Sequence, residues 1–348
     1  MRIDWVPEPE PGPGTVKIAV EWCGICGTDL HEYFDGPIFC PAPGKSHPLT
    51  GASLPVVLGH EFVGTVHSVG EGVRRIRLGD RVVVEPRRSC GQCAACTSGR
   101  YNCCPRAATI GLQGGGGGLA QYIVVDEDLV FQIGDLSAEV GALIEPLAVA
   151  HHAIGQGPRP QGATAVVFGG GPIGLLVVWM LKAMGASTVC LVEPSEARRS
   201  RAGRLGADHA LDPTAYPSTE RMLEYAGLSD VDVAFECAGV EAALQGCLIA
   251  VRPGGTVVNV AISGRPLSLD LTPLLLKEIH LVGTICYAND HQPVIDLLRR
   301  YALPVETLVT KRIGLDQLVT AGFRALASGD ENHVKILVSP TMTQPESE

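Results

Sequence analysis

Residues 164–193 read TAVVFGGGPIGLLVVWMLKAMGASTVCLVE. The apolar run at 165–168 has the length and the β-branched content of a buried parallel strand. After the glycines come a helical stretch at 175–184, a second apolar run at 188–192 and the acidic residue Glu193. This order of strand, glycine turn, helix, strand and acid predicts a βαβ unit of a doubly wound parallel sheet.

The glycine turn fits the dinucleotide-binding pattern G-x-G-x-x-G. Gly169, Gly171 and Gly174 would allow a tight turn, close approach of a pyrophosphate and close packing of the helix on the strand. The helix starts near Pro172, and its free N–H groups would hold the pyrophosphate. Glu193 lies where a carboxylate can accept hydrogen bonds from the adenosine ribose. A glycine turn without a ligand is the alternative, but strand, helix and acid in register favour dinucleotide binding.

The residues around this turn also bear on the choice of cofactor. Ile173 in the turn, and Val260 and Ile262 at the end of a later strand, are further candidate contacts of the cofactor. Arg198 and the arginine after it could hold a 2′-phosphate, although a solvated helix face is their ordinary interpretation. Glu193 would repel that phosphate, so we expect NAD rather than NADP.

Length and composition narrow the class of protein. A chain of 348 residues is long enough for two domains. With no run of 18 apolar residues and no apolar signal core at the N-terminus, we expect a cytoplasmic protein without a membrane span. The net charge of −10, without any block of Lys or Arg, argues against a nucleic-acid partner. In such a protein, twelve cysteines indicate metal binding or catalysis rather than disulfides.

The two halves of the chain differ in their pattern. Before residue 139, short strands with glycine turns, among them 15–22, predict an antiparallel and partly barrel-like β domain. From residue 139 onward, helices and strands alternate, which is typical of an α/β domain. We therefore expect two domains of different architecture.

One cluster of cysteines has metal-binding spacing. Two residues separate Cys90 from Cys93 and Cys93 from Cys96, and Cys103 and Cys104 follow. Four thiolates can close tetrahedrally on one zinc ion. A reduced cysteine-rich loop, an iron–sulfur cluster and chance are the alternatives. We favour structural zinc because this Gly- and Ser-containing loop needs a crosslink, but spacing alone does not choose between Cys103 and Cys104.

A second polar cluster lies at 23–31, CGICGTDLH. Its C-x-x-C pair could be a redox pair or half of a zinc site, and the redox interpretation is weak because that motif belongs to a different βαβ context. His60 and Glu61 stand at a glycine turn between strands. The five glycines at 114–118 form either a flexible linker or a close approach of backbone to a neighbouring site, and the sequence leaves both open.

Four motifs stand in one order: CGICGTDLH at 23–31, GHE at 59–61, CGQCAACTSGRYNCC at 90–104 and GGGPIG at 169–174. Together they resemble the zinc-dependent medium-chain dehydrogenase/reductase family of alcohol and polyol dehydrogenases. The resemblance covers almost the whole chain and implies an α/β protein. Its GroES-like antiparallel β catalytic domain would span 1–148 with 287–348, and its Rossmann domain, a doubly wound parallel sheet, would span 149–286.

The resemblance also implies a set of catalytic residues: Cys26, Thr28, His31, His60, Glu61 and Glu145. Cys26 and His60 would bind a catalytic zinc, with Glu145 as the third ligand. Glu61 is a second candidate oxygen ligand that could exchange with Glu145 or water. Thr28 and His31 match a proton relay, although His31 could also be an ordinary surface residue. For the structural zinc, the family pattern selects Cys104 over Cys103.

Within the family, HEYFDGPIF and SHPLTGASLPVVLGHEFVG are most similar to butanediol dehydrogenases. The implied reaction is NAD-dependent oxidation of (R,R)-2,3-butanediol to acetoin, and its reverse. Sorbitol, threonine or another small polyol or alcohol is the alternative substrate. A non-catalytic, zinc-stabilised dinucleotide-binding protein is the alternative of another class, whereas a zinc-free reductase would lack the ligand cluster.

The family pattern raises two further expectations about strand edges. A homodimer or homotetramer would form through edge strands near 257–261 or 279–285. Compared with the pattern, roughly ten or more residues of N-terminal strand are missing, which predicts an exposed sheet edge.

Overall fold

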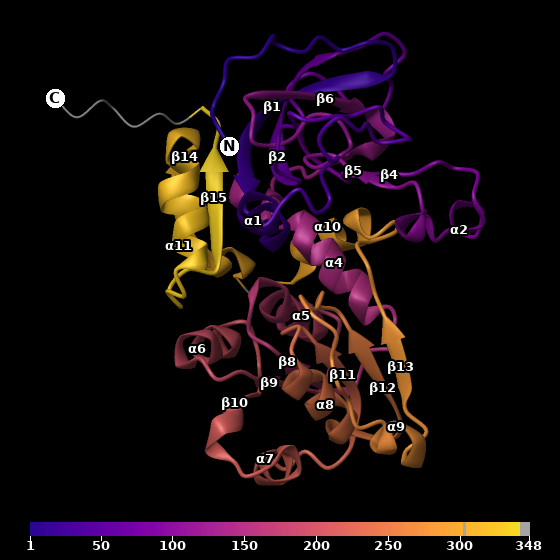
Figure 1. The fold of residues 1–348 in the computed structure, drawn as a ribbon, viewed down its shortest axis with the longest axis vertical. Coiled ribbons are helices and arrows are strands. Elements are labelled where there is room, and N and C mark those ends of the chain that lie inside the picture. The colour runs from indigo at the N-terminus through magenta and orange to yellow at the C-terminus, as the bar shows by residue number, and fades with distance from the viewer. Residues whose placement is uncertain (302–303, 342–348) are drawn as a thin grey trace, which may run out of the picture. The chain divides into compact units, whose positions relative to one another are not determined.

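The computed structural model describes residues 1–301 and 304–341. The chain forms two compact units (Figure 1): the first comprises Met1–Glu145 and Val309–Glu348, and the second Pro146–Leu308. The predicted domain limits, 1–148 with 287–348 and 149–286, differ mainly in 287–308, which pack within the second unit. Within the described residues, no helix is long and apolar enough to cross a membrane.

The first unit is built on a seven-stranded sheet of order β14-β15-β1-β2-β3-β7, with β6 also paired to β1. Its pairs are antiparallel except β14 with β15, which agrees with the predicted antiparallel β domain. The strands are β1 (Thr15–Gly24), β2 (Glu61–Val69), β3 (Arg81–Val84), β6 (Tyr122–Asp126), β7 (Val130–Gln132), β14 (Val309–Gly314) and β15 (Lys335–Ser339). A separate ribbon pairs β4 (Arg87–Arg88) with β5 (Ala108–Thr109).

Strand β1 is central to this sheet. Its alternating apolar residues Val16, Ile18 and Val20 are buried in the core of the first unit. One edge of β1 pairs with β2, and the other pairs with β6 and then β15. Among the described residues, β1 is thus paired on both sides, and the expected open sheet edge does not lie on it.

Helices of the first unit are short. They are α1 (Gly27–Phe34), α2 (Ala94–Thr97), α3 (Ala138–Gly141) and α11 (Arg324–Ala327), with a π-helix over Leu318–Phe323 and 3-10 turns over Tyr101–Cys103, Glu127–Leu129 and Leu315–Gln317. The region 37–55 contains no helix or strand, as its Pro and Gly content predicts. The N-cap residue of α1 is Cys26, one of the predicted metal ligands.

The second unit contains a parallel sheet of six strands in the order β10-β9-β8-β11-β12-β13. The strands are β8 (Thr164–Phe168), β9 (Thr188–Val192), β10 (His209–Leu211), β11 (Val231–Glu236), β12 (Val251–Asn259) and β13 (His280–Gly283). The chain goes from β8 outward to β10 and then returns to β11 on the other side of β8. This reversal is the switch point of a doubly wound sheet, where ligands bind at the carboxyl ends of the strands.

Helices surround this sheet. They are α4 (Ile144–Ile154), α5 (Pro172–Ala183), α6 (Glu196–Arg204), α7 (Thr219–Tyr225), α8 (Glu241–Ala250), α9 (Thr272–Leu276) and α10 (His291–Arg300), with 3-10 turns over Pro213–Ala215 and Val305–Leu308. Helix α5 packs on β8 and β9, and α8 packs on β8, β11 and β12. The residues 174–181 of α5 are all buried, as expected for a helix that is apolar on every side.

The position of the sheet edges corrects one expectation. Strand β12 pairs with β11 on one side and with β13 on the other, so the predicted edge near 257–261 is wrong. Strand β13 ends the sheet, which leaves 279–285 as the edge segment.

Candidate functional site

Cys26, His60 and Glu61 come together in the first unit. The pairing of Gly24 with Glu61 brings the end of β1 beside the start of β2. As a result, one ligand atom from each of the three residues lies within 4.8 Å of the others. A thiolate, an imidazole and a carboxylate are a donor set suited to zinc.

Asp29 supports this group, although the sequence did not single it out. It is fully buried in α1, and its Oδ2 atom accepts a hydrogen bond of 2.9 Å from the backbone N–H of Cys26. Its Oδ1 atom lies 3.7 Å from Nδ1 of His60. A carboxylate behind a metal-binding imidazole fixes the ring orientation and leaves the other ring nitrogen for the metal. The signal in the sequence was the spacing: Asp29 is an acidic residue three positions after Cys26, the N-cap of α1.

Burial and charge shift the pKa values of this pair. Burial raises the pKa of Asp29 above its usual value. For His60, burial is the largest effect and lowers the pKa, but the Cys26 thiolate and Asp29 together raise it well above 6.5. The pocket therefore stabilises positive charge on or beside this imidazole, which is the electrostatic property that a cation site needs.

Glu61 has a buried ionic partner from the end of the chain. Nζ of Lys335, in β15, lies 2.8 Å from Oε1 and 2.6 Å from Oε2 of Glu61. Burial is the largest effect on Lys335 and lowers its pKa, but the charges of Glu61, Cys26 and Glu145 raise it overall. Lys335 was not among the predicted site residues, although a lysine inside the apolar stretch 334–338 indicates a buried anionic partner.

The other predicted catalytic residues lie nearby in the first unit. The Cys26 Sγ and Thr28 Oγ1 atoms are 3.7 Å apart. His31 lies one turn further along α1, and its side chain is 65% exposed. Glu145 is buried in the first turn of α4 and acts electrostatically on His60. Among the described residues, however, the group within 4.8 Å comprises Cys26, His60 and Glu61, and Glu145 stands outside it.

Glycines allow the backbone around His60 to pack closely. At Gly117, a Cβ atom would lie 2.3 Å from the carbonyl oxygen of Val57, and at Gly118 one would lie 2.6 Å from the side chain of Phe62. Gly59, with a φ of +95°, leaves room for the buried Cys23. The glycines at 114–118 were expected to form either a flexible linker or a close approach of backbone to a neighbouring site. The second interpretation holds for Gly117 and Gly118.

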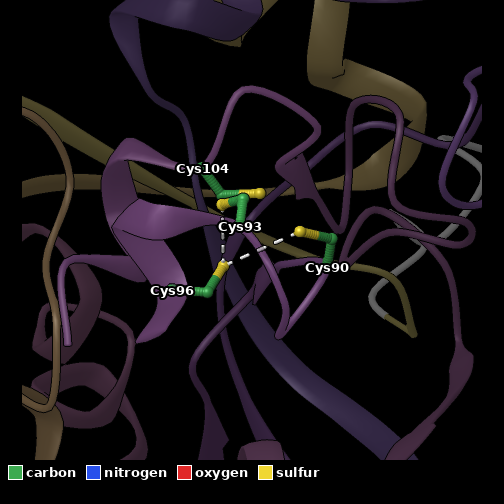
Figure 2. Close-up of side chains that lie close together, drawn as sticks. All are labelled: Cys90, Cys93, Cys96 and Cys104. Carbon is green, nitrogen blue, oxygen red and sulfur yellow. Dashed lines mark hydrogen bonds between the residues drawn. The ribbon is translucent and has the colours of Figure 1, made fainter. Parts of the chain in front are cut away.

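The four cysteines predicted to hold structural zinc also come together. Figure 2 shows the side chains of Cys90, Cys93, Cys96 and Cys104 gathered around one point, and their sulfur atoms lie within 4.8 Å of one another. The Cys93–Cys96 sulfur distance is 3.5 Å, and the Cys90–Cys96 distance is 3.9 Å. Cys104 is buried in this group, whereas its neighbour Cys103 is exposed.

Thiols of this group differ in the direction of their pKa shifts. The backbone N–H of Gln92 is the main cause that lowers the pKa of Cys90 to about 5, with help from Arg106. For Cys93, the backbone N–H of Cys96 is the largest effect and lowers the pKa, but burial and hydrogen bonds to the neighbouring sulfurs raise it overall to about 11. Several thiolates at such short range repel one another unless a cation lies among them, which fits a tetrahedral zinc site.

In the second unit, the glycine turn joins β8 to α5. Gly169 has a φ of +103° and makes the tight turn after β8. A Cβ atom at Gly174 would lie 1.9 Å from the carbonyl oxygen of Gly169, so this position needs glycine for helix–strand packing. A Cβ atom at Gly171 would meet nothing within 4 Å, so this N-cap of α5 is open to a ligand. Pro172 and Ile173 begin the first turn of α5, where the N–H groups of Ile173 and Gly174 have no partner within the helix.

Glu193 lies at the end of β9, beside this turn. Its Oε2 atom accepts a hydrogen bond of 2.6 Å from the backbone N–H of Gly170, and its Oε1 accepts one of 2.9 Å from Ser195. Arg198 Nη1 lies 3.9 Å from Oε2 of Glu193. The arginine is thus paired with the acid that would repel a 2′-phosphate.

The last two cofactor candidates follow β12. The backbone N–H of Val260 donates to the carbonyl oxygen of Glu236 at the end of β11. Ile262 has a side chain that is 70% exposed. Both residues lie at the carboxyl end of the parallel sheet, on the side where the glycine turn also lies.

Comparison with known proteins gives a family match within each of the two units. Residues 12–135 match the alcohol dehydrogenase GroES-like domain, and residues 172–300 match the zinc-binding dehydrogenase family. The first match covers the metal group and the four cysteines, and the second begins at the first turn of α5.

Relatives match over nearly the full chain. An (R,R)-butanediol dehydrogenase of Neisseria gonorrhoeae is 42% identical and covers 98% of this chain and 97% of that protein. The crystal structure of 2R,3R-butanediol dehydrogenase from Bacillus subtilis superposes with a TM-score of 0.91 at 43% identity, covering 98% of this chain and 96% of that one. A sorbitol dehydrogenase of Bacillus subtilis is 36% identical over 98% of this chain and 94% of its own length. The chain therefore belongs to the zinc-dependent alcohol dehydrogenases, a family of oxidoreductases.

Proposed function

We propose that the chain oxidises (R,R)-2,3-butanediol to acetoin with NAD, and catalyses the reverse reduction. The observation that carries the proposal is the group of Cys26, His60 and Glu61, with Asp29 behind the imidazole. The two butanediol dehydrogenases that match at 42% and 43% identity support the choice of substrate.

In this proposal, Cys26, His60 and Glu145 bind the catalytic zinc, and Glu61 is a further oxygen ligand. The donor set fits zinc, and Asp29 directs the second ring nitrogen of His60 toward the site. Bound there, zinc supplies a Lewis acid that lowers the pKa of the substrate hydroxyl. Thr28, beside Cys26, accepts the hydroxyl proton, and the exposed imidazole of His31 exchanges it with water.

The glycine turn and Glu193 bind the cofactor. The open N-cap at Gly171 and the N–H groups of Ile173 and Gly174, in the first turn of α5, receive the pyrophosphate. Glu193 accepts hydrogen bonds from the adenosine ribose and disfavours a 2′-phosphate there, which selects NAD over NADP. Bound NAD supplies the acceptor for the substrate hydride.

A second zinc ion at Cys90, Cys93, Cys96 and Cys104 serves structure. These residues lie in a lobe with only short helices and a two-stranded ribbon. Such a segment has little core of its own, so a metal crosslink supplies much of its folding free energy.

The chain is further proposed to form a homodimer or homotetramer through β13. This strand ends the described sheet, and the neighbouring α9 carries Leu275 and Leu276 with side chains 78% and 74% exposed. An open strand edge beside exposed leucines favours pairing with a second copy. A cytoplasmic location and the lack of nucleic-acid or membrane partners remain predictions from the sequence.

Steady-state rates with NAD and NADP over a panel of diols, sorbitol and threonine test the substrate. We expect the highest kcat/KM for (R,R)-2,3-butanediol with NAD. A preference for sorbitol, the substrate named for the 36% identical relative, would refute the assignment. Turnover is also measured before chelation, after chelation and after zinc is added back. An enzyme should lose activity on chelation and regain it with zinc, whereas a non-catalytic dinucleotide-binding protein would show no turnover with or without zinc.

A further inference from the structure

Asp290 joins two helices of the second unit through one carboxylate. Its Oδ1 atom lies 2.5 Å from Nδ1 of His151, and its Oδ2 atom lies 2.9 Å from Nδ1 of His152. Both histidines belong to the last turn of α4, whereas Asp290 is the N-cap residue of α10. Because Asp290 is only 6% exposed and its carboxylate accepts from both imidazoles, it fixes the start of α10 on α4.

The Asp290 carboxylate also shapes the loop that precedes α10. Its Oδ2 atom accepts a hydrogen bond of 2.7 Å from the backbone N–H of Ala288. Within this loop, Cys286 has a φ of +49° and Asn289 has a φ of +64°. The left-handed region is unfavourable for residues with a side chain, so neighbouring contacts must hold the loop in this conformation. The buried side chain of Tyr287 supplies another such contact.

This loop lies where the second half of a bound dinucleotide would be. It follows β13, so it stands at the carboxyl end of the parallel sheet, as the glycine turn after β8 does. Glu193, the proposed partner of the adenosine ribose, follows β9 on one side of β8. With the pyrophosphate at the turn, the nicotinamide half must extend over the strand ends on the other side of β8, those of β11, β12 and β13.

Thr284 gives the start of the loop a polar group for a ligand. Its backbone N–H donates a hydrogen bond of 3.2 Å to the carbonyl oxygen of Asn259, at the end of β12. Its Oγ1 atom is buried and has no hydrogen-bond partner among the residues that the structure describes. Leaving a buried hydroxyl unpaired is costly, and a polar group of the nicotinamide half of the cofactor would satisfy it.

We propose that Asp290 is a positioning residue for the nicotinamide half of the cofactor, because it holds the loop 284–290 in the conformation that binds. His151 and His152 anchor this carboxylate on α4. The groups that bind the adenosine half lie on the other side of β8 and do not depend on this anchor. The inference rests on the proposed binding of NAD but on no particular alcohol substrate.

Equilibrium titrations with NAD and with ADP test the inference, because ADP carries the adenosine and diphosphate groups but no nicotinamide. Asp290→Asn removes the charge and one of the two acceptor oxygens that hold the imidazoles. If the loop then spends about a tenth of its time in the binding conformation, the Kd for NAD rises about 10-fold. The Kd for ADP should stay within about twofold of the wild-type value, which a general loss of structure would not allow.

Variants of the two histidines test the anchor itself. Replacing both by leucine removes both donors and should weaken NAD binding as Asp290→Asn does. Replacing both by asparagine places an amide N–H near each Nδ1 position and should restore most of the affinity for NAD. These pairs of variants differ in hydrogen bonding at the same two positions of α4, so their difference isolates the bonds to Asp290.

Asp232→Asn is the matched control in the same sheet. Asp232 accepts a hydrogen bond of 2.9 Å from the backbone N–H of Thr164 and one of 2.9 Å from Nε of Arg252. These bonds lie at the amino ends of β8 and β11, away from the proposed cofactor. The variant should therefore lower stability and leave both Kd values unchanged.

The single variant His151→Leu, which keeps the bond to His152, decides the matter if Asp290→Asn does not fold. It should also weaken NAD binding and spare ADP binding, and so should Thr284→Val, which removes the buried hydroxyl. Unchanged NAD affinity in a folded Asp290→Asn, or equal weakening of NAD and ADP, would overturn the inference and leave the proposed cofactor in place. A wild-type chain that binds neither ligand would refute the proposed cofactor and the inference together.

Discussion

Asp29 Oδ1 lies 3.7 Å from His60 Nδ1, and neither buried atom has a hydrogen-bond partner within the described part of the chain. When His60 binds zinc, this carboxylate can accept a hydrogen bond from the Nδ1–H group and hold the imidazole in one tautomer. A metal bound to the other ring nitrogen of His60 therefore explains why the two buried atoms, Asp29 Oδ1 and His60 Nδ1, face each other.

Asp29→Asn should weaken binding of the catalytic zinc about 10- to 100-fold, because the amide orients the imidazole less strongly than a carboxylate. Competition with a chelator, with the zinc content of each chain measured, gives the affinity. The four-cysteine zinc serves as the internal control and should be retained. Equal zinc affinity in variant and wild type would show that Asp29 does not orient His60.

Cys104→Ser should remove the structural zinc and lower the free energy of unfolding by about 3 kcal/mol or more, since the metal crosslinks a segment with little core. Cys103→Ser is the matched control, because Cys103 is exposed outside the sulfur group. It should keep both zinc ions and change stability by less than about 0.5 kcal/mol. Urea unfolding and zinc content measure both effects, and the reverse pattern would assign the ligand to Cys103.

Substitutions at two glycines of the turn should affect NAD binding and protein stability differently. Gly171→Ala adds a methyl group in open space, so stability should change by less than about 0.5 kcal/mol while the Kd for NAD rises about 10-fold. Gly174→Ala places its methyl group against the carbonyl oxygen of Gly169 and should destabilise the fold by about 1–3 kcal/mol. Thermal unfolding and calorimetric titration with NAD distinguish the two. Unchanged NAD affinity in Gly171→Ala would place the pyrophosphate elsewhere.

Asp290 should make the second unit sensitive to acid. It lies 2.5 Å from Nδ1 of His151 and 2.9 Å from Nδ1 of His152. Burial is the largest effect and raises its pKa, but the bonds to the two histidines outweigh it and lower the pKa to about 2. Because the folded pKa lies below the unfolded value of 3.8, this stabilisation is present above pH 3.8 and is lost as the pH falls toward 2.

Asp290→Asn should therefore lower the free energy of unfolding by about 2 kcal/mol at pH 5–7. The difference from wild type should shrink as the pH falls from about 4 to 2. Urea unfolding across this range is the measurement. A difference that stays constant down to pH 2 would show that Asp290 does not titrate as described.

Local sequence was sufficient for features formed by neighbouring residues. The predicted strand at 188–192 matches Thr188–Val192, and the glycine turn after β8 lies where its pattern placed it. The short spacings of Cys90, Cys93 and Cys96 likewise predicted a cysteine group in one lobe, whereas the choice of Cys104 over Cys103 came from the family pattern. Such features need no knowledge of strand order.

Contacts between residues far apart in the chain could not be predicted from local sequence. Lys335 meets Glu61 only because β15 and β2 flank β1, and the two residues are 274 positions apart in the chain. The later strand, which was expected to end with Val260 and Ile262, ends at Asn259, since pairing with β11 and β13 sets its limit. The role of Gly117 and Gly118 likewise required knowledge of which backbone lies against them.

The arrangement of β1, β2 and β15 has a consequence for biosynthesis. The ribosome makes the continuous segment Pro146–Leu308 before it reaches β14 and β15, so the second unit can fold while the sheet of the first is still incomplete. Until β15 emerges, Glu61 has no ammonium partner. A nascent chain thus presents its metal-binding residues to cellular zinc in a different electrostatic state from the finished protein.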